Sequence, residues 1–243
     1  MKLYQPINVL RVQLVEMSRL SQRALDYSIK GYQLGSPELS RSVCSTECEL
    51  EQRHQRIKEI CRKLAARKVT DSADCRFVLI ALRLSSALRT TSRAAVQIAQ
   101  DTPSFFDSSR MPKHAALCNL GDLVNSLVRL CIVALFKQEA RYAETVLQSQ
   151  AVWRRCEFVF ESMHEAEHQT TDDQDIFEPA IARSLGTVAR QAHDMADAIL
   201  FWLKESDREL FRANGHDTLN FLFVGSSIAP ETLPGLLPLP WVN

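Results

Sequence analysis

Apolar residues recur at steps of three and four along most of the chain, which is the pattern of amphipathic helices. The pattern is clearest between Asp74 and Gln100, on a face made of Phe77, Ala81, Leu84, Leu88, Thr91, Ala95 and Ile98. A weaker copy of the second half of this segment runs from Leu185 to Asp197. Two related helices at such a separation indicate a duplicated unit.

The same spacing predicts six long helices, over residues 6–34, 37–68, 74–100, 113–136, 140–167 and 176–203. Ser36 is predicted to cap the second helix, with Pro37 at its first position. Residues 101–112 contain two prolines and form the predicted linker between two sets of three helices. Short loops make sequential helices antiparallel neighbours. The predicted fold is therefore all-α, with two three-helix bundles in tandem.

The predicted boundaries place the first repeat at residues 1–104, the second at residues 112–206, and a C-terminal extension at residues 207–243. The extension holds an apolar patch from Leu219 to Val224 and is rich in Pro and Leu from Gly225 onward. Proline cannot continue a helix, so an irregular tail is predicted that straps the bundle or docks a partner.

Charge and composition exclude several functional classes. Lys plus Arg and Asp plus Glu are both 29, and this balance argues against a dedicated nucleic-acid or acidic-membrane binder. The longest apolar run, Leu130 to Phe136, is too short to span a bilayer, and no secretory signal is visible. Seven cysteines, all within predicted helices, are typical of reduced thiols in a cytoplasmic protein. Cys44 and Cys48 lie one turn apart, but thiols on helices more often fill core space than bind metal.

In the second helix a valine, Val43, is followed at steps of four residues by two acids, Glu47 and Glu51, and the segment Ala73 to Val78 opens the predicted third helix. Both segments resemble the PhoU family of phosphate-transport regulators, in its spacing of a valine and two acids and in the start of its third helix. The resemblance covers roughly residues 6–205. It implies a helical, non-enzymatic, cytoplasmic regulator in contact with phosphate ABC transporter subunits and a phosphate-sensing histidine kinase. A homo-oligomer with at most peripheral membrane association, and without nucleic acid, is expected.

The resemblance also implies a metal cluster, held by acids four residues apart in each repeat, and this chain departs from that pattern. Arg89 and Arg93 replace the acids of the third helix, and Gly186 and Arg190 replace those of the second repeat. Gln150 and Arg154 stand at the positions that match Glu47 and Glu51. No metal and no cofactor are therefore expected.

Residues four apart share a helix face, so Glu47 and Glu51 are predicted to form ion pairs with Arg89 and Arg93 across two helices. Two alternatives remain. The charges are a solvated face without partners, or Arg89, Arg93, Arg154 and Arg190 bind phosphate, a phosphorylated ligand or an acidic protein surface.

One motif suggests another chemistry. His164-Glu165-Ala166-Glu167-His168 matches the H-E-x-x-H pattern of zinc peptidases. The motif runs directly into an acidic loop, and no third ligand follows at helical spacing, which favours chance occurrence or adventitious zinc. Two alternatives to a phosphate regulator thus remain: a helical scaffold for another transporter or signalling partner, and a zinc hydrolase using His164 and His168.

Overall fold

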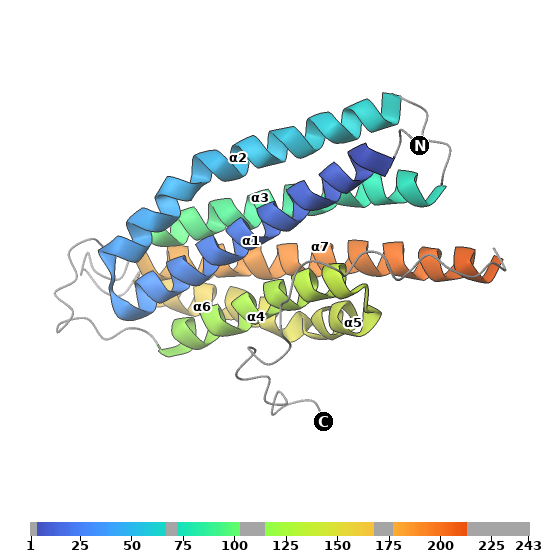
Figure 1. The fold of residues 1–243 in the computed structure, drawn as a ribbon. Helices are drawn as coiled ribbons and strands as arrows, with labels where there is room; N and C mark the ends of the chain where they lie inside the picture. The colour runs from blue at the N-terminus through green and yellow to red at the C-terminus, as the bar shows by residue number, and fades with distance from the viewer. Residues whose placement is uncertain (1–3, 67–71, 103–114, 168–176, 213–243) are drawn as a thin grey trace. The chain divides into compact units, whose positions relative to one another are not determined.

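The computed structural model of the protein describes residues 4–66, 72–102, 115–167 and 177–212, and in these ranges the regular secondary structure is entirely helical (Figure 1). The helices are α1 (Tyr4–Leu34), α2 (Pro37–Ala66), α3 (Ser72–Asp101), α4 (Ala115–Lys137), α5 (Ala140–Gln148), α6 (Gln150–Glu167) and α7 (Phe177–Arg212). The predicted all-α class is confirmed. The predicted linker beyond Thr102, the acidic loop before α7 and the tail after Arg212 lie outside the described residues.

Residues 1–207 form one compact unit, and the apolar faces predicted from the sequence build its core. Each residue of the predicted α3 face is buried, from Phe77 to Ile98. The fully buried large side chains are Leu10, Leu14, Met17, Leu25, Leu50, Ile57, Leu64, Leu84, Leu88, Ile98, Leu117 and Leu120. Burial of such side chains contributes about 1.5–3 kcal/mol each and stabilises the bundle. The second unit begins at Arg208, and only its first residues, the end of α7, are described.

The turn between α1 and α2 follows the predicted chemistry. Gly35 has φ 62°, the left-handed conformation that glycine adopts without a steric cost. The Ser36 N–H donates to the Gly31 carbonyl at 3.0 Å and closes α1. The Ser36 hydroxyl accepts the Leu39 N–H at 3.4 Å, and Pro37 is the first residue of α2. The predicted cap is confirmed.

The prediction of one continuous helix over residues 140–167 is wrong. The chain leaves the helical conformation at Ser149, with φ −87° and ψ 27°, and continues as α6. No Gly or Pro marks the break in the sequence. At the break the Ser149 N–H donates to the Val146 carbonyl at 3.0 Å, a bond over three residues in place of the four-residue bond of the α-helix.

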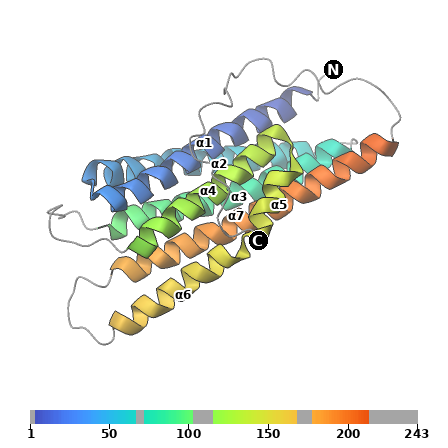
Figure 2. The ribbon, with the colours of Figure 1, turned by 90° about the horizontal axis from the view of Figure 1, so that it is seen from below.

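Helices α1 and α4 pack together and join the first three helices to the later ones (Figure 2). Gly121 of α4 lies against Ile29, so close that a Cβ atom at Gly121 would lie 2.9 Å from Ile29 Cγ2. Hydrogen bonds between polar side chains of α1 and α4 form a polar seam next to this contact. Asp26 accepts hydrogen bonds from Asn125 and Arg129 of α4, each at 3.0 Å. The close approach and the seam together set the register of the two helices.

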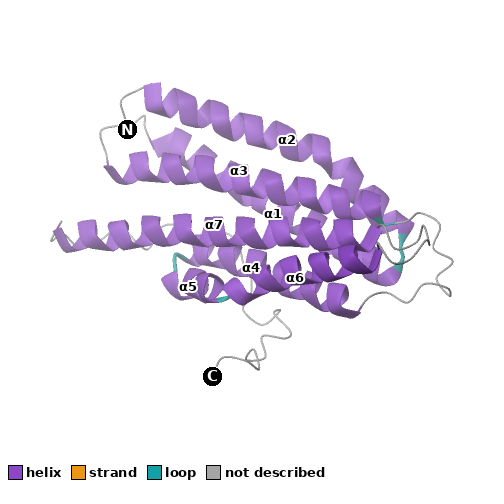
Figure 3. Cartoon of the chain, turned by 180° about the vertical axis from the view of Figure 1, so that it is seen from behind, coloured by secondary structure: helices purple, strands orange, loops and turns teal. Residues whose placement is uncertain are grey.

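Helices α3 and α7 lie side by side and run in opposite directions (Figure 3). The rings of Phe77 and Trp202 are 5.7 Å apart between centroids, and Arg83 forms an ion pair with Asp197 at 3.0 Å. The pair of helices that share a sequence pattern therefore meet directly.

Within the described residues one helix, α4, is long and apolar enough to cross a membrane, judged by length and composition alone, with a mean hydropathy of 1.5. Judged only from the uninterrupted apolar run Leu130–Phe136, the sequence predicts no membrane span, whereas the whole of α4 is apolar enough on average. Half of the apolar stretch is buried inside the bundle, including Leu117, Val124 and Cys131, which is the environment of a core helix.

Candidate functional site

The candidate site lies where α2 and α3 run antiparallel, with Glu51 and Arg89 at its centre. The Arg89 Nε donates to Glu51 Oε2 at 2.5 Å, and both side chains are about two-fifths exposed, at 38% and 40%. Gln55, one turn further along α2, donates to the other Glu51 oxygen at 2.8 Å. The bonds from Gln55 and Arg89 hold the pKa of Glu51 below its usual range. A pair this exposed contributes only about 0–1 kcal/mol to stability, so its effect is mainly on orientation.

His54 lies beside this ion pair on the inner side of α2. It is buried, at 6% exposure, and its Nδ1 has no hydrogen-bond partner among the described residues. Burial, and then the positive charge of Arg89, lower the pKa of His54 from its usual value near 6.5. The imidazole is therefore neutral at pH 7 and fills space next to the pair.

The second predicted pair, Glu47 with Arg93, does not form. Both side chains are exposed, and neither makes an ion pair within 4.0 Å in the part of the chain that the structure describes. The α2–α3 register, given by Glu51 with Arg89 and by Cys61 with the Val78 carbonyl, nevertheless places them opposite each other one turn further on. The structure thus brings together two of the four predicted residues.

The equivalent positions between α6 and α7 contain no carboxylate. The Arg190 guanidinium lies over the Trp153 ring, 5.9 Å from its centroid, and Gln150 Nε2 lies 3.4 Å from His193 Nε2. Gly186 leaves room for Cys156. Arg154 is exposed and has no ion-pair partner among the described residues. The two repeats therefore use different chemistry at matching places.

The residues present do not fit the metal cluster that the family resemblance implies. On α2–α3 the guanidinium of Arg89 bonds to the Glu51 carboxylate, and a fixed positive charge there repels a second cation. Among the described side chains no three His, Cys, Asp or Glu groups are placed to hold a metal ion. We therefore assign no metal chemistry to this site.

The other candidate residues lie apart from the ion pair. The motif from His164 to His168 lies outside the described side chains, so its zinc chemistry stays an open alternative. Cys44 and Cys48 are exposed on α2, and Cys48 accepts a bond from Gln52 at 3.4 Å. Burial raises the pKa of Cys61 to about 11 and that of Cys156 to about 12, so both thiols stay protonated.

Sequence reasoning missed the aromatic supports of the arginines on α7. Arg183 lies over the Phe160 ring at 5.9 Å, as Arg190 does over Trp153. A Trp and a Phe seven residues apart on α6, and two arginines seven apart on α7, were visible signals. They became interpretable only once the two helices were seen to pack face to face.

The helical order and the duplicated pattern define a bundle of long helices, and this fold is shared with known proteins. Residues 14–102, which span most of α1 to α3, match the family model described as the PhoU domain. Two solved structures share the fold. PhoU from Pseudomonas aeruginosa is 17% identical, with a TM-score of 0.75, and the match covers 84% of this chain and 100% of that one. The phosphate transport system regulatory protein PhoU from Streptococcus pneumoniae is 14% identical, with a TM-score of 0.71, over 81% of this chain and 94% of that one.

A comparison with curated protein sequences gives no match. The resemblance to the PhoU family is confirmed by the family model over residues 14–102. At such low identity the two solved structures establish the fold over the larger part of the chain.

Proposed function

We propose that the protein regulates phosphate uptake by protein–protein contacts with phosphate ABC transporter subunits and a phosphate-sensing histidine kinase. The observation that carries this proposal is the match of residues 14–102 to the PhoU domain. The printed name of the Streptococcus pneumoniae structure, a phosphate transport system regulatory protein, supports it. The proposed regulator is non-enzymatic, cytoplasmic and homo-oligomeric, with at most peripheral membrane association.

Gene deletion tests this function in the source organism. The deletion strain is expected to take up radioactive phosphate and to express a phosphate-starvation reporter even when phosphate is abundant, and a plasmid copy restores both. A plasmid that encodes the Arg155→Ala variant serves as the control for expression, because Arg155 is exposed and lies outside the α2–α3 and α3–α7 faces. It should restore normal phosphate uptake and normal reporter levels as well. Unchanged uptake and reporter levels in the deletion strain would reject phosphate regulation.

We further propose that the Arg89–Glu51 pair replaces the family's metal and orients α2 against α3. Purified protein is then expected to contain no stoichiometric iron, zinc or manganese by elemental mass spectrometry. A stoichiometric metal that disappears in Glu47→Ala would reject this role.

A second candidate is a scaffold that regulates a different transporter or signalling protein. It is favoured by one observation, the arginines at positions where the family keeps acids, because a change of surface charge changes the partners that a surface accepts. Affinity purification of the tagged chain under high and low phosphate separates the two candidates. Recovery of phosphate-transporter subunits supports the first, and their consistent absence beside another transporter supports the second.

A further inference from the structure

The outer surface formed by α3 and α7 carries two distinct ends, which we call the apolar end and the cationic end. Arg83 and Asp197 join the helices at 3.0 Å and set their antiparallel register. Leu79 lies one turn before Arg83, and Phe201 lies one turn after Asp197, so the two apolar side chains stand opposite each other. They are 66% and 59% exposed. Large apolar side chains paired on a surface are typical of contact sites.

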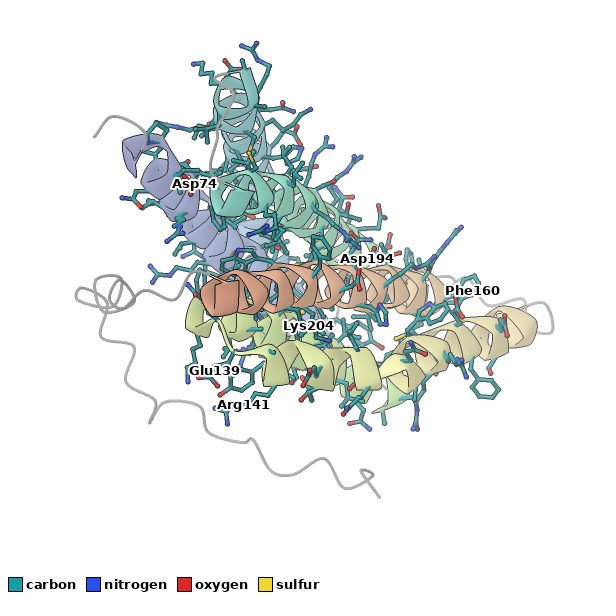
Figure 4. All side chains as sticks on the ribbon, turned by 90° about the vertical axis from the view of Figure 1, so that its right-hand side faces the viewer. Asp74, Glu139, Arg141, Phe160, Asp194 and Lys204 are labelled. Carbon is teal, nitrogen blue, oxygen red and sulfur yellow. The ribbon has the colours of Figure 1, made fainter. Side chains whose placement is uncertain are left out.

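The cationic end lies in the other direction along the same helices. Arg190 precedes Asp197 by two turns, and Arg93 lies on the neighbouring stretch of α3. Arg183 extends the series on α7. All three are exposed, and none forms an ion pair within 4.0 Å among the described residues. Three carboxylates lie near these arginines: Asp194 on the α3 side of α7 (Figure 4), Glu47 of α2 opposite Arg93, and Glu157 of α6 between the two stacked rings. None of them forms an ion pair with these arginines within 4.0 Å among the described residues.

Two of these arginines are held by rings and still have free donors. The guanidinium groups of Arg183 and Arg190 lie over Phe160 and Trp153, each 5.9 Å from the ring centroid. A guanidinium that stacks on a ring keeps its N–H groups available for bidentate bonds to a carboxylate. Stacking also restricts the side chain before binding, which lowers the entropy lost when a partner docks. The cationic end is therefore pre-organised for acidic groups.

The spacing of the two ends matches a short helix. Eleven residues separate Arg190 from Phe201 on α7, which is about 16 Å or three helical turns. We infer that the α3–α7 surface binds an amphipathic helical segment of a partner protein. Its apolar side chains would contact Leu79 and Phe201, and its acidic residues, about three turns away, would contact Arg93 and Arg190. This inference deepens the proposed regulatory function and rests on it, because it names the segment that a partner presents.

The occupant is a protein segment rather than nucleic acid or membrane. Binding of a nucleic acid depends on positive charge that neutralises its phosphates, and the chain carries no net charge to attract a polyanion. An anionic membrane would meet Asp194 and Asp197 between the two ends, at a cost in repulsion. An acidic amphipathic helix satisfies both ends at once.

A synthetic probe tests the inference with the full-length protein. The probe is a fluorescent, helix-stabilised peptide of about 16 residues, with Leu and Phe at one end of one face and three Glu at the other. Fluorescence anisotropy is expected to show saturable binding that weakens about tenfold or more in Arg93→Glu/Arg190→Glu and in Leu79→Ser/Phe201→Ser. Phe158→Ser is the matched control, because Phe158 is also exposed but lies on the far side of α6.

Variants of the probe keep the test decisive if a protein variant folds poorly. A peptide with Lys in place of Glu, and one with Ser in place of Leu and Phe, should each bind about tenfold more weakly to the unaltered protein. Equal binding of the Lys peptide, or no binding of the original, would overturn the inference. The inference would also be overturned if inorganic phosphate displaced the peptide while Leu79→Ser/Phe201→Ser left peptide binding unchanged. That combination would show a site that binds anions without using the apolar end. These outcomes leave the uptake assay untouched, so failure here is distinct from failure of the proposed function.

Discussion

Two glycines on different helices allow the packing between α1 and α4 to be tested quantitatively. A Cβ atom at Gly121 would lie 2.9 Å from Ile29 Cγ2, a distance that real Cβ contacts do not show. Ile29 is buried, and its β-branched side chain has little rotamer freedom to move aside. At Gly186, by contrast, the new methyl group would meet Cys156 Cβ at 3.4 Å, an ordinary van der Waals contact.

The expected free energies differ in sign. Alanine in place of glycine inside a helix stabilises it by about 1 kcal/mol. For Gly186→Ala that gain should appear in full. For Gly121→Ala overpacking costs about 1–3 kcal/mol, which cancels or exceeds the gain. The two variants should therefore differ by about 1–3 kcal/mol in the free energy of unfolding, although the substitution is chemically identical.

Urea and thermal unfolding followed by circular dichroism measure this difference. Gly186→Ala should melt about 2–4 °C above the unaltered protein, and Gly121→Ala at or below it. Ile29→Ala removes the clashing methyl group, so Gly121→Ala should become stabilising in that background, with a coupling of about 1 kcal/mol or more. Equal stabilisation by Gly121→Ala and Gly186→Ala, or a coupling near zero, would refute the close α1–α4 approach.

Three further predictions concern protonation, thiol exposure and the C-terminal segment. The folded state lowers the pKa of His54, so the unfolded state binds more protons below pH 6.5. The melting temperature should therefore fall as the pH is lowered from about 7.5 to about 5.5, and it should fall less in His54→Gln. Arg89→Ala should raise the pKa of His54 in an NMR titration, because it removes the neighbouring positive charge. Iodoacetamide should label Cys44 and Cys48 in the native protein, whereas Cys61, Cys131 and Cys156 should react only in denaturant, as read by peptide mass spectrometry; native labelling of Cys131 would contradict its burial. Deleting residues 213–243 should leave the melting temperature unchanged, since Ile7 to Leu203 of the described residues already form a continuous buried apolar core; a large loss of stability would show that the tail belongs to the core.

The sequence by itself determined the helices, their buried faces and the first turn. These features depend on neighbours three or four positions away, so periodicity, Gly35, Ser36 and Pro37 were sufficient to predict them. The sequence also identified Glu51 and Arg89 as residues on facing helices, because a four-residue spacing defines a face. It failed at Ser149, where α5 ends without a glycine or proline and the Ser149 N–H bonds to the Val146 carbonyl three residues back.

Only the tertiary structure decided which charges meet. Glu47 and Arg93 share the spacing of Glu51 and Arg89, yet an ion pair within 4.0 Å forms at one position and not at the other. The stacking of Arg190 on Trp153, and the opposition of Leu79 to Phe201, likewise follow from the α6–α7 and α3–α7 registers. Those registers arise from side chains far apart in the chain that fill one common core, and no local pattern encodes them.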